Sequence, residues 1–409
     1  MTQSPVQVCM HVLGAARTDG RVMRAATALA EAGFAVSIVD IESVESGDPA
    51  RGAGNIRHVR RKVEHVRNVC IKHVNVPASF MATRFRCWGL LKALWLFLRS
   101  TQLLIQTPAD IYHAHDVTAL PACYIAARLR HKPLIFDAHE LPLKELEGAH
   151  RRWLRTILTP LLATMIRRSA GIITASPLYA REIRKRYAVG EVSLIRNLPP
   201  YRNVRKNDRL RQQLGLSSTA RIALYQGYLQ PDRGLDVLVR AAAFLEQDIV
   251  IVMMGKAVEE TLAQLRALIV SEGVAERVKI MPAVPYEELL DWTASADIGL
   301  NVLPPDYSQS IRLCLPNKLF EYLMAGLPVL TSELDAVAEV VRACDVGHVV
   351  SSLAPRDVAA AIDTLLVDDA ALARMRCNAL DVAQREFCWE KEAEQLVGFY
   401  RDRSPRVTR

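Results

Sequence analysis

The stretch PNKLFEYLMAGLPVL, residues 316–330, predicts a helix that ends at Gly326 and runs into a short apolar strand. Asn317 and Lys318 fall in the first helical turn, where unpaired backbone N–H groups and the positive end of the helix dipole attract anions. Glu321 lies one turn further on, so its side chain can reach the same ligand. A carboxylate accepts hydrogen bonds from ribose hydroxyls, and an amide beside an ammonium suits a diphosphate. The stretch therefore predicts a site for a nucleoside diphosphate.

The same stretch also fits an ordinary amphipathic helix that packs on a sheet. Four apolar side chains would then form its buried face: Leu319, Phe320, Leu323 and Met324. Polar residues are common at helix starts, so the local spacing alone leaves both interpretations open.

Strands and helices alternate along the whole chain, which predicts an α/β fold with parallel sheets. The first half has apolar strand patterns at 6–12, 34–39, 110–115, 133–136, 171–174 and 192–195. The run NLPPY at 197–201 breaks the pattern, which restarts with strands at 222–225, 249–254, 278–281 and 298–303. We therefore expect a first domain over 1–198, a linker over 199–218, a second domain over 219–385 and a C-terminal helix over 386–409 that packs back on the first domain.

The net charge of the 409-residue chain is +8, and it is unevenly distributed. Residues 51–100 contain 11 Lys and Arg against one acid, and residues 151–187 contain nine against one. Helical patterns with basic flanks lie at 84–105 and 151–168. They fit either amphipathic helices on an anionic membrane or helices packed on the sheet. No nucleic-acid-binding module accompanies the basic residues, so we expect no nucleic-acid partner.

The eight cysteines show no CxxC pair or metal-ligand spacing, which is typical of reduced core cysteines in a cytosolic protein. The N-terminus lacks a basic segment followed by an apolar run, and no uncharged apolar run reaches the roughly 18–20 residues that span a bilayer. We therefore expect a cytoplasmic protein that is either soluble or peripheral on the inner face of the cell membrane.

Six ionisable residues follow two successive strand patterns in the first half: His113, His115, Asp116, Asp137, His139 and Glu140. The carboxyl ends of parallel strands meet at one edge of a sheet, where α/β proteins bind ligands. The His-x-His-Asp spacing resembles a set of metal ligands. The same groups also fit an acceptor and sugar site in which a histidine forms hydrogen bonds or moves a proton. Both interpretations stay open.

Loops of the second half carry cations at the corresponding strand ends. Arg233 follows the strand at 222–225, and Lys256 follows the one at 249–254. Both would lie beside the helix that begins near Lys318, where three cations and a helix dipole converge. The first loop of the chain, 13–20, contains two glycines that let backbone approach a ligand, although a plain turn fits it equally well.

Eight segments match, in order, the pattern of GT-B glycosyltransferases of retaining family 4: DGRVMRAATALAEAGFAV, HAHD, FDAHE, GIITAS, LIRNLPP, YQGYLQPDRGLDVLVRA, MGK and PNKLFEYLMAGLPVL. The chain resembles this family along nearly its whole length. The resemblance implies two facing Rossmann-like domains with a deep interdomain cleft, the first for the acceptor and the second for the nucleotide sugar. It also implies a metal-independent hexosyltransferase that retains the anomeric configuration and needs no cofactor besides its UDP- or GDP-linked donor.

The resemblance also implies roles for individual residues. Glu321 would hold the donor ribose, Arg233 would contact the diphosphate, and His139 would lie near the transferred sugar. The implied catalytic residues are His139, Arg233, Lys256 and Glu321. The implied donor-binding residues are Gly14, Gly227, Arg233, Lys256, Asn317, Lys318, Leu319 and Glu321. The implied acceptor-side residues are Asp19, Arg21, His115, Asp116 and Glu140.

Two positions depart from the family pattern. Many members carry E-x7-E, but Leu313 occupies the first position here, and Tyr228 stands where an Arg usually follows the glycine. Because the missing Glu normally contacts the transferred sugar, the identity of that sugar stays open.

The expected reaction is transfer of a sugar to a lipid-linked or polysaccharide acceptor at the cytoplasmic membrane face, as in polysaccharide biosynthesis. Two alternatives remain. A UDP-N-acetylhexosamine 2-epimerase of the GT-B fold would use the carboxylates and histidine at 137–140. A non-catalytic GT-B subunit would bind a nucleotide sugar without turnover, and Leu313 is consistent with that.

Overall fold

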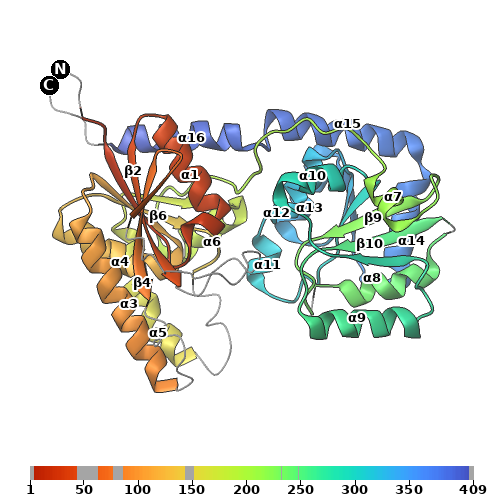
Figure 1. Ribbon diagram of the computed structural model, residues 1–409, viewed down its shortest axis with the longest axis horizontal. Helices are drawn as coiled ribbons and strands as arrows, with labels where there is room; N and C mark the ends of the chain where they lie inside the picture. Colours follow the sequence, from red (N-terminus) through yellow and green to blue (C-terminus); the bar gives the residue numbers. More distant parts are fainter. Residues whose placement is uncertain are drawn as a thin grey trace, which may run out of the picture. The chain divides into compact units, whose positions relative to one another are not determined.

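The computed structural model describes residues 4–43, 63–76, 86–142, 152–231, 233–246 and 248–404. The chain forms two α/β units (Figure 1). Unit 1 contains Met1–Arg196 and Glu392–Arg409, and unit 2 contains Asn197–Lys391. The first unit boundary thus lies two residues before the predicted one at 198/199, and the second lies six residues after the one at 385/386. The segment 199–218, predicted as a linker, lies wholly in unit 2 and includes helix α7 (Arg209–Leu214).

Unit 1 is built on a sheet with the strand order β3-β4-β2-β1-β5-β6-β7-β8. Its strands are β1 (Gln7–His11), β2 (Ala35–Ser43), β3 (Val63–Val66), β4 (Val69–Val76), β5 (Ile111–His115), β6 (Leu134–Ala138), β7 (Gly171–Thr174) and β8 (Ser193–Leu194). The pair β3 and β4 is antiparallel, and the other described pairs are parallel. Every residue of β5 and β6 is buried, because a central parallel strand is covered on both faces.

The helices of unit 1 are α1 (Gly20–Glu31), α3 (Arg86–Gln106), α4 (Asp116–Leu129), α5 (Arg152–Arg167), α6 (Pro177–Tyr187) and α16 (Trp389–Arg403). The C-terminal helix α16 packs on the strands of unit 1, although it is far from them in sequence. The carboxylate of Glu392 accepts two hydrogen bonds of 2.7 Å from Arg196, one from the backbone N–H and one from Nε. Phe399 lies so close to Gly171 that a Cβ there would be 2.5 Å from its ring.

Unit 2 is built on a parallel sheet with the strand order β11-β10-β9-β12-β13-β14. Its strands are β9 (Arg221–Gln226), β10 (Ile249–Met254), β11 (Val278–Met281), β12 (Ile298–Asn301), β13 (Val329–Ser332) and β14 (Gly347–Val350). Its remaining helices are α8 (Leu235–Ala241), α9 (Glu259–Ser271), α10 (Tyr286–Thr293), α11 (Gln309–Leu313), α12 (Asn317–Met324), α13 (Asp335–Cys344), α14 (Pro355–Val367) and α15 (Asp369–Arg385).

Helix α12 confirms the packed amphipathic helix predicted for residues 316–330, and it leaves the nucleotide site of its polar first turn as a prediction, because the two interpretations concern different faces. Its four apolar side chains form part of the core of unit 2, and each is at most 1% exposed: Leu319, Phe320, Leu323 and Met324. Its polar first turn begins directly after Pro316. Gly326 follows with φ +69°, a left-handed conformation that glycine adopts without strain and that ends the helix.

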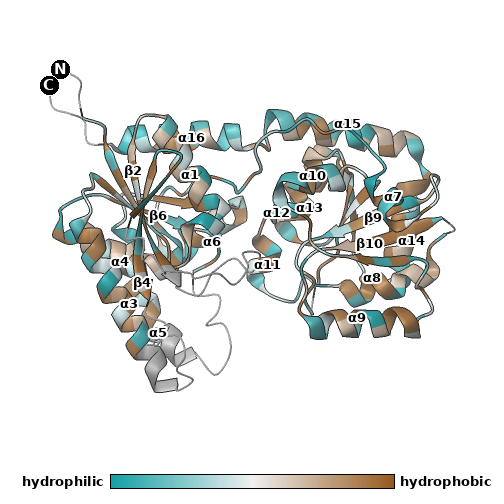
Figure 2. Ribbon diagram, viewed as in Figure 1, coloured by the Kyte–Doolittle hydropathy of each residue, from teal (hydrophilic) through white to brown (hydrophobic). Residues whose placement is uncertain are grey.

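Apolar residues concentrate on the strands inside each unit (Figure 2). The helix predicted at 84–105 is α3, and the one at 151–168 is α5. Parts of the first basic segment, 51–62 and 77–85, lie outside the described residues. Within the ranges that the structure describes, no helix is long and apolar enough to cross a membrane.

Candidate active site

The predicted donor-side residues meet where α12 begins and β9 ends. Glu321 is buried, and its Oε2 accepts a hydrogen bond of 2.6 Å from Nε2 of Gln226, the last residue of β9. Asn317 is exposed in the first turn of the helix and accepts a hydrogen bond of 3.0 Å from Asn197. A fixed carboxylate thus lies one turn beyond a helix start that has no side-chain cap hydrogen bond.

The ammonium group of Lys318 lies against the loop that follows β9. Its Nζ is 3.9 Å from the centre of the Tyr225 ring, and a Cβ placed on Gly227 would be 3.8 Å from it. Burial lowers the pKa of Lys318 to about 7, the Arg233 guanidinium acts in the same direction, and Glu321 opposes both. A bound anion would favour the charged form of this lysine.

Glycines bring the loops after β9 and β10 into contact. Gly227 has φ +132°, and its carbonyl oxygen would be 1.6 Å from a Cβ on Gly255. A side chain on Gly255 would therefore force the two loops apart. The backbone N–H of Leu229 donates to the carbonyl of Lys256 at 2.7 Å, which holds the Gly-Lys turn beside the first loop.

The other predicted donor-binding residues differ in whether their side chains are placed to contact a ligand. Arg233 lies near Lys318 and Tyr225, whose pKa values it affects, and its Nη2 is 3.5 Å from the side-chain oxygen of Gln230. The side chain of Lys256 is exposed to solvent beside this loop. Leu319 does not fit as a ligand-binding side chain, because it is fully buried and its N–H donates to the carbonyl of Pro316 at 3.0 Å.

A second polar cluster lies in unit 1 at the carboxyl ends of β5 and β6. The guanidinium of Arg21 forms two hydrogen bonds with Asp137, of 2.7 and 2.9 Å, and a third with the carbonyl of Ile195 at 2.8 Å. Burial alone would raise the pKa of Asp137, but Arg21 and His139 hold it well below its usual range. This buried carboxylate therefore stays ionised.

His139 is the member of this cluster that reaches the surface. Its side chain is 20% exposed, and its Nε2 lies 3.2 Å from Nδ1 of His115 and 3.6 Å from Oδ2 of Asp137. The histidine thus has a fixed ring and an edge that a ligand can approach. This arrangement suits a group that donates a hydrogen bond or transfers a proton.

The two remaining histidines are fully buried. The rings of His113 and His115 stack with centres 4.1 Å apart, and Nδ1 of His113 lies 2.5 Å from the hydroxyl of Tyr400 on α16. Burial lowers the pKa of both histidines, so both are neutral.

The metal interpretation of the His-x-His-Asp pattern is weakened by these contacts. His113, His115 and Asp137 place one ligand atom each within 4.8 Å of one another, which is close enough for a metal ion. However, both oxygens of Asp137 accept hydrogen bonds from Arg21, and a cation beside that guanidinium would be repelled. The cluster fits an internally paired network better than a metal site.

Several predicted acceptor-side residues take other roles. Arg21 and His115 are buried in the cluster, so neither contacts an acceptor directly. Asp19 caps α1, and its Oδ1 accepts hydrogen bonds from the backbone of Arg21 and Val22 at 3.0 and 3.1 Å. Charge pairing and capping thus account for these three side chains in the folded protein, and their acceptor-side roles stay predictions.

Asp116, Glu140 and Gly14 remain at the open edge of unit 1. Asp116 and Glu140 are half-buried, and Asp116 has φ +66°, a conformation that is uncommon for a residue other than glycine. Strained positions of this kind gather at functional sites. A Cβ on Gly14 would have no atom within 4 Å, so its surroundings leave room for a ligand.

Sequence reasoning missed two residues that hold these clusters together. Gln226 is a polar residue at the end of an apolar strand, which is a signal that could have drawn attention to it. Tyr400 is 287 residues from His113, so no local pattern connects them.

Comparison with known families decides the class of protein. The model of Glycosyltransferase Family 4 matches residues 21–198, and the model of Glycosyl transferases group 1 matches residues 220–368. The chain belongs to the family 4-like GT-B glycosyltransferases. The family predicted from the ordered motifs is therefore confirmed.

Solved structures confirm the GT-B fold of this glycosyltransferase. Sucrose-phosphate synthase from Thermosynechococcus elongatus superposes with a TM-score of 0.76 at 18% identity, over 97% of this chain and 98% of that chain. The HepE protein of Anabaena in complex with UDP superposes with a TM-score of 0.72 at 16% identity, over 97% of this chain and 100% of that chain. Identities this low show a shared fold alone.

Curated relatives of this glycosyltransferase match about half of the chain's length. The D-inositol 3-phosphate glycosyltransferase of Thermobispora bispora is 31% identical over 209 residues, which are 49% of this chain and 47% of that protein. The one from Nocardioides sp. is 33% identical over 207 residues, which are 47% of this chain and 43% of that protein. The chain thus spans about half the length of the curated relatives it matches.

Proposed function

We propose that this glycosyltransferase transfers a sugar from a UDP-linked donor, with retention of the anomeric configuration, to a lipid-linked or polysaccharide acceptor at the cytoplasmic face of a membrane. The observation that carries the proposal is the group of Lys318, Arg233 and Glu321 at the start of α12. Excess positive charge at a helix start suits a diphosphate, and a fixed carboxylate suits the hydroxyls of a ribose. The UDP bound to HepE favours uridine as the base.

In the proposed reaction, the bond between the anomeric carbon and the diphosphate breaks, and the diphosphate leaves with the bonding electrons. Lys318, Arg233 and the backbone N–H groups of α12 would stabilise the negative charge as it develops. These fixed cations supply the charge that Mg²⁺ often supplies to phosphates, so we propose that the reaction needs no metal. Chelation by EDTA should then leave the rate unchanged.

On the acceptor side, we assign His139 to the sugar that is being transferred. Its ring is fixed by His115 and Asp137, and its exposed edge would be able to hydrogen-bond a sugar hydroxyl. Leu313 at the end of α11 takes the place of a glutamate that many family members use on the same sugar. A histidine contact would therefore carry more of the sugar recognition here than in those members.

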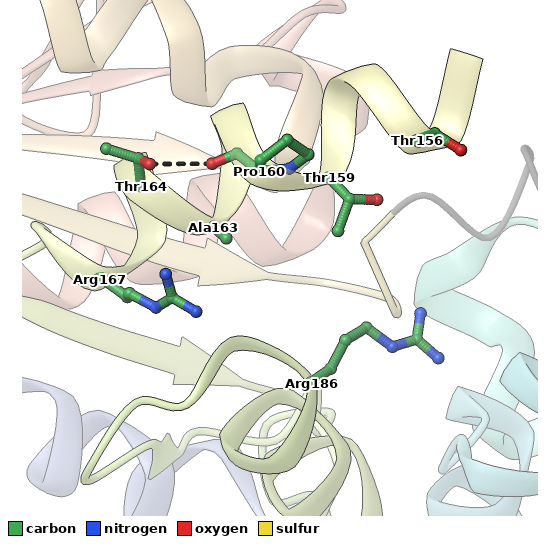
Figure 3. A pocket seen from close by; sticks show the side chains of 7 residues that line it. All are labelled: Thr156, Thr159, Pro160, Ala163, Thr164, Arg167 and Arg186. Carbon is green, nitrogen blue, oxygen red and sulfur yellow. Dashed lines mark hydrogen bonds between the residues drawn. The ribbon is translucent and has the colours of Figure 1, made fainter. Parts of the chain in front are cut away.

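The proposed acceptor class rests on the surface of unit 1. Leu91, Leu94 and Leu98 of α3 are 56%, 52% and 55% exposed, at a spacing that puts them on one face. A pocket of about 820 Å³ is lined by one face of α5, which ends at Arg167, and by Arg186 of α6 (Figure 3). Exposed leucines suit acyl chains, and the guanidinium groups of Arg167 and Arg186 suit phosphate headgroups.

A thermal-shift screen of UDP, GDP, ADP and their sugar conjugates tests the donor site. A ligand that binds only the folded protein raises its melting temperature, so UDP should stabilise the wild type. Glu321→Ala should lose this effect, whereas Glu333→Ala, which removes an exposed carboxylate paired with Arg342, should keep it. The proposal fails if no nucleotide stabilises the wild type, or if Glu321→Ala responds as the wild type does.

Liposome flotation tests the acceptor side. The wild type should float with vesicles that contain anionic lipid at low salt. It should dissociate from them at high salt, because salt screens the electrostatic attraction. Leu94→Glu should weaken flotation, whereas Val270→Glu, a charge at an exposed position on α9, should not. Equal flotation of the two variants would contradict a membrane contact through α3.

A further inference from the structure

Gln226 holds a position that neither the family pattern nor the donor site accounts for. It ends the apolar strand β9, and it is 2% exposed. Its Nε2 donates to Oε2 of Glu321 at 2.6 Å, and its Oε1 accepts from the hydroxyl of Thr293 on α10, also at 2.6 Å. Thr293 is fully buried as well, so the three side chains form a polar chain inside unit 2.

The chemistry of these groups allows one orientation of the amide. An ionised carboxylate only accepts hydrogen bonds, so the amide nitrogen of Gln226 has to face Glu321. Its oxygen then faces Thr293, whose single hydroxyl hydrogen can reach this oxygen at 2.6 Å or the carbonyl of Leu289 at 2.7 Å, and donates to one of them at a time. The carboxylate of Glu321 therefore determines which way the amide points, Thr293 anchors the amide oxygen, and the amide determines where one oxygen of Glu321 lies.

The backbone of Gln226 is fixed independently of its side chain. Its N–H donates to the hydroxyl of Tyr322 at 2.9 Å, and that hydroxyl lies 3.0 and 3.2 Å from the carbonyls of Leu224 and Leu300. Tyr322 fits there because Gly299 has no side chain, since a Cβ at that position would be 2.5 Å from the tyrosine ring. The amide therefore projects toward Glu321 from a rigid base.

We infer that Gln226 is a positioning residue for nucleotide binding, which holds the carboxylate of Glu321 in the orientation that receives the two ribose hydroxyls, with Thr293 fixing its amide. The inference rests on the proposed function, in which Glu321 binds the ribose. A group that aligns a binding carboxylate in advance lowers the entropy lost on binding. The effect of Gln226 should therefore depend on the ribose hydroxyls, whereas a purely structural role would weaken every ligand alike.

The test compares the affinities of UDP and 2′,3′-dideoxy-UDP by isothermal titration calorimetry, in the full-length protein. The wild type should prefer UDP, and Gln226→Leu should reduce the UDP preference by about tenfold while leaving the affinity for the dideoxy ligand unchanged. Thr293→Val should reduce the preference for UDP less than Gln226→Leu does. Thr293→Ser should keep the wild-type preference, because it retains the hydroxyl. Adding Gln226→Leu to Glu321→Ala should cause no further loss, since the two changes act on one interaction.

The matched control is Thr331→Val, which removes another buried hydroxyl at a strand end of unit 2, bonded to Asn301 rather than to Glu321. It should lower the melting temperature and keep the UDP preference. The inference is overturned if Gln226→Leu binds the two ligands with the wild-type ratio, or weakens both equally. If the wild type binds neither ligand, the proposed function fails first and the inference falls with it.

Discussion

The two polar clusters of this glycosyltransferase differ in charge balance. In unit 1, Arg21 and Asp137 neutralise each other, and the buried His113 and His115 are neutral. In unit 2, Lys318 and Arg233 lie near one described carboxylate, Glu321, and burial pulls the pKa of Lys318 down to about 7. Each cluster lies at the carboxyl end of a parallel sheet, where sequence patterns predict a ligand site.

The difference in charge balance favours the unit 2 cluster as the ligand-binding one in the proposed function. A buried network whose charges are paired is complete in the folded protein, so it positions a neighbouring group such as His139. A group of cations in excess of its acids is stabilised when an anion binds. In this account, the balance of cations and acids in a polar cluster indicates ligand binding better than the location of the cluster at the carboxyl ends of strands.

The largest effect is expected from a substitution that breaks the ion pair of the unit 1 cluster. Asp137→Asn should destabilise the protein by about 3–5 kcal/mol, because it leaves the buried Arg21 without its carboxylate. Urea denaturation measures this change. The control Lys132→Met removes a half-exposed ion pair with Asp110 in the same unit, and it should cost only about 0–1 kcal/mol. Equal effects would show that the Arg21–Asp137 pair is not a structural core.

The unit 2 cluster should respond in the opposite way. Lys318→Met should weaken UDP binding about 30-fold, because a charged hydrogen bond to the diphosphate is lost. Its free energy of unfolding at pH 7 should not decrease, because the charged form of Lys318 is disfavoured by its surroundings. Calorimetry and urea denaturation of the same variant separate the two effects. A variant that is destabilised yet binds UDP normally would reverse the assigned roles.

The pH dependence of binding sharpens the comparison further. The pKa of Lys318 is about 7 in the folded protein against an ordinary 10.5, so the unfolded chain binds the extra proton between these values and stability should rise with pH across that window. A bound diphosphate restores the proton, so UDP affinity should fall about tenfold between pH 6 and pH 8, relative to Lys318→Met. Calorimetry in buffers of different ionisation enthalpy should detect proton uptake on binding at pH 8. No uptake would contradict a role for Lys318.

The smallest expected effect concerns the hydrogen bond between Tyr400 and His113. Tyr400→Phe should lower the free energy of unfolding by about 1 kcal/mol, because a buried hydrogen bond is lost. UDP affinity should not change, since the unit 1 cluster does not hold the nucleotide in this account. A Tyr400→Phe variant with normal stability and impaired UDP binding would indicate that the nucleotide binds in unit 1, which contradicts the account.

Local patterns predicted much of this structure. The apolar spacing and glycine of residues 316–330 predicted α12 and β13, and the alternation of strands and helices predicted the parallel strands of both sheets, although not the antiparallel pair β3 and β4. Those signals depend only on neighbouring residues in the sequence, so they can be recognised without knowing the tertiary structure.

Long-range pairing could not be predicted. Arg21 and Asp137 are 116 residues apart, and nothing in the sequence near either one shows that they neutralise each other. The family resemblance therefore implies an acceptor-side role for Arg21 and His115, because the sequence pattern is the same whether such a side chain is paired inside the protein or open to a ligand. Asp19 was assigned there too, although its role as a helix cap is a local pattern.

Hydrogen–deuterium exchange with and without UDP tests the central claim most directly. The account predicts that UDP slows exchange in the loop after β9, residues 227–234, and in α12 (Asn317–Met324), because the ligand contacts both. The Glu321→Ala variant should lose this protection. Protection confined to the ends of β5 and β6, with α12 exchanging as in the free protein, would contradict the assignment of the nucleotide to unit 2.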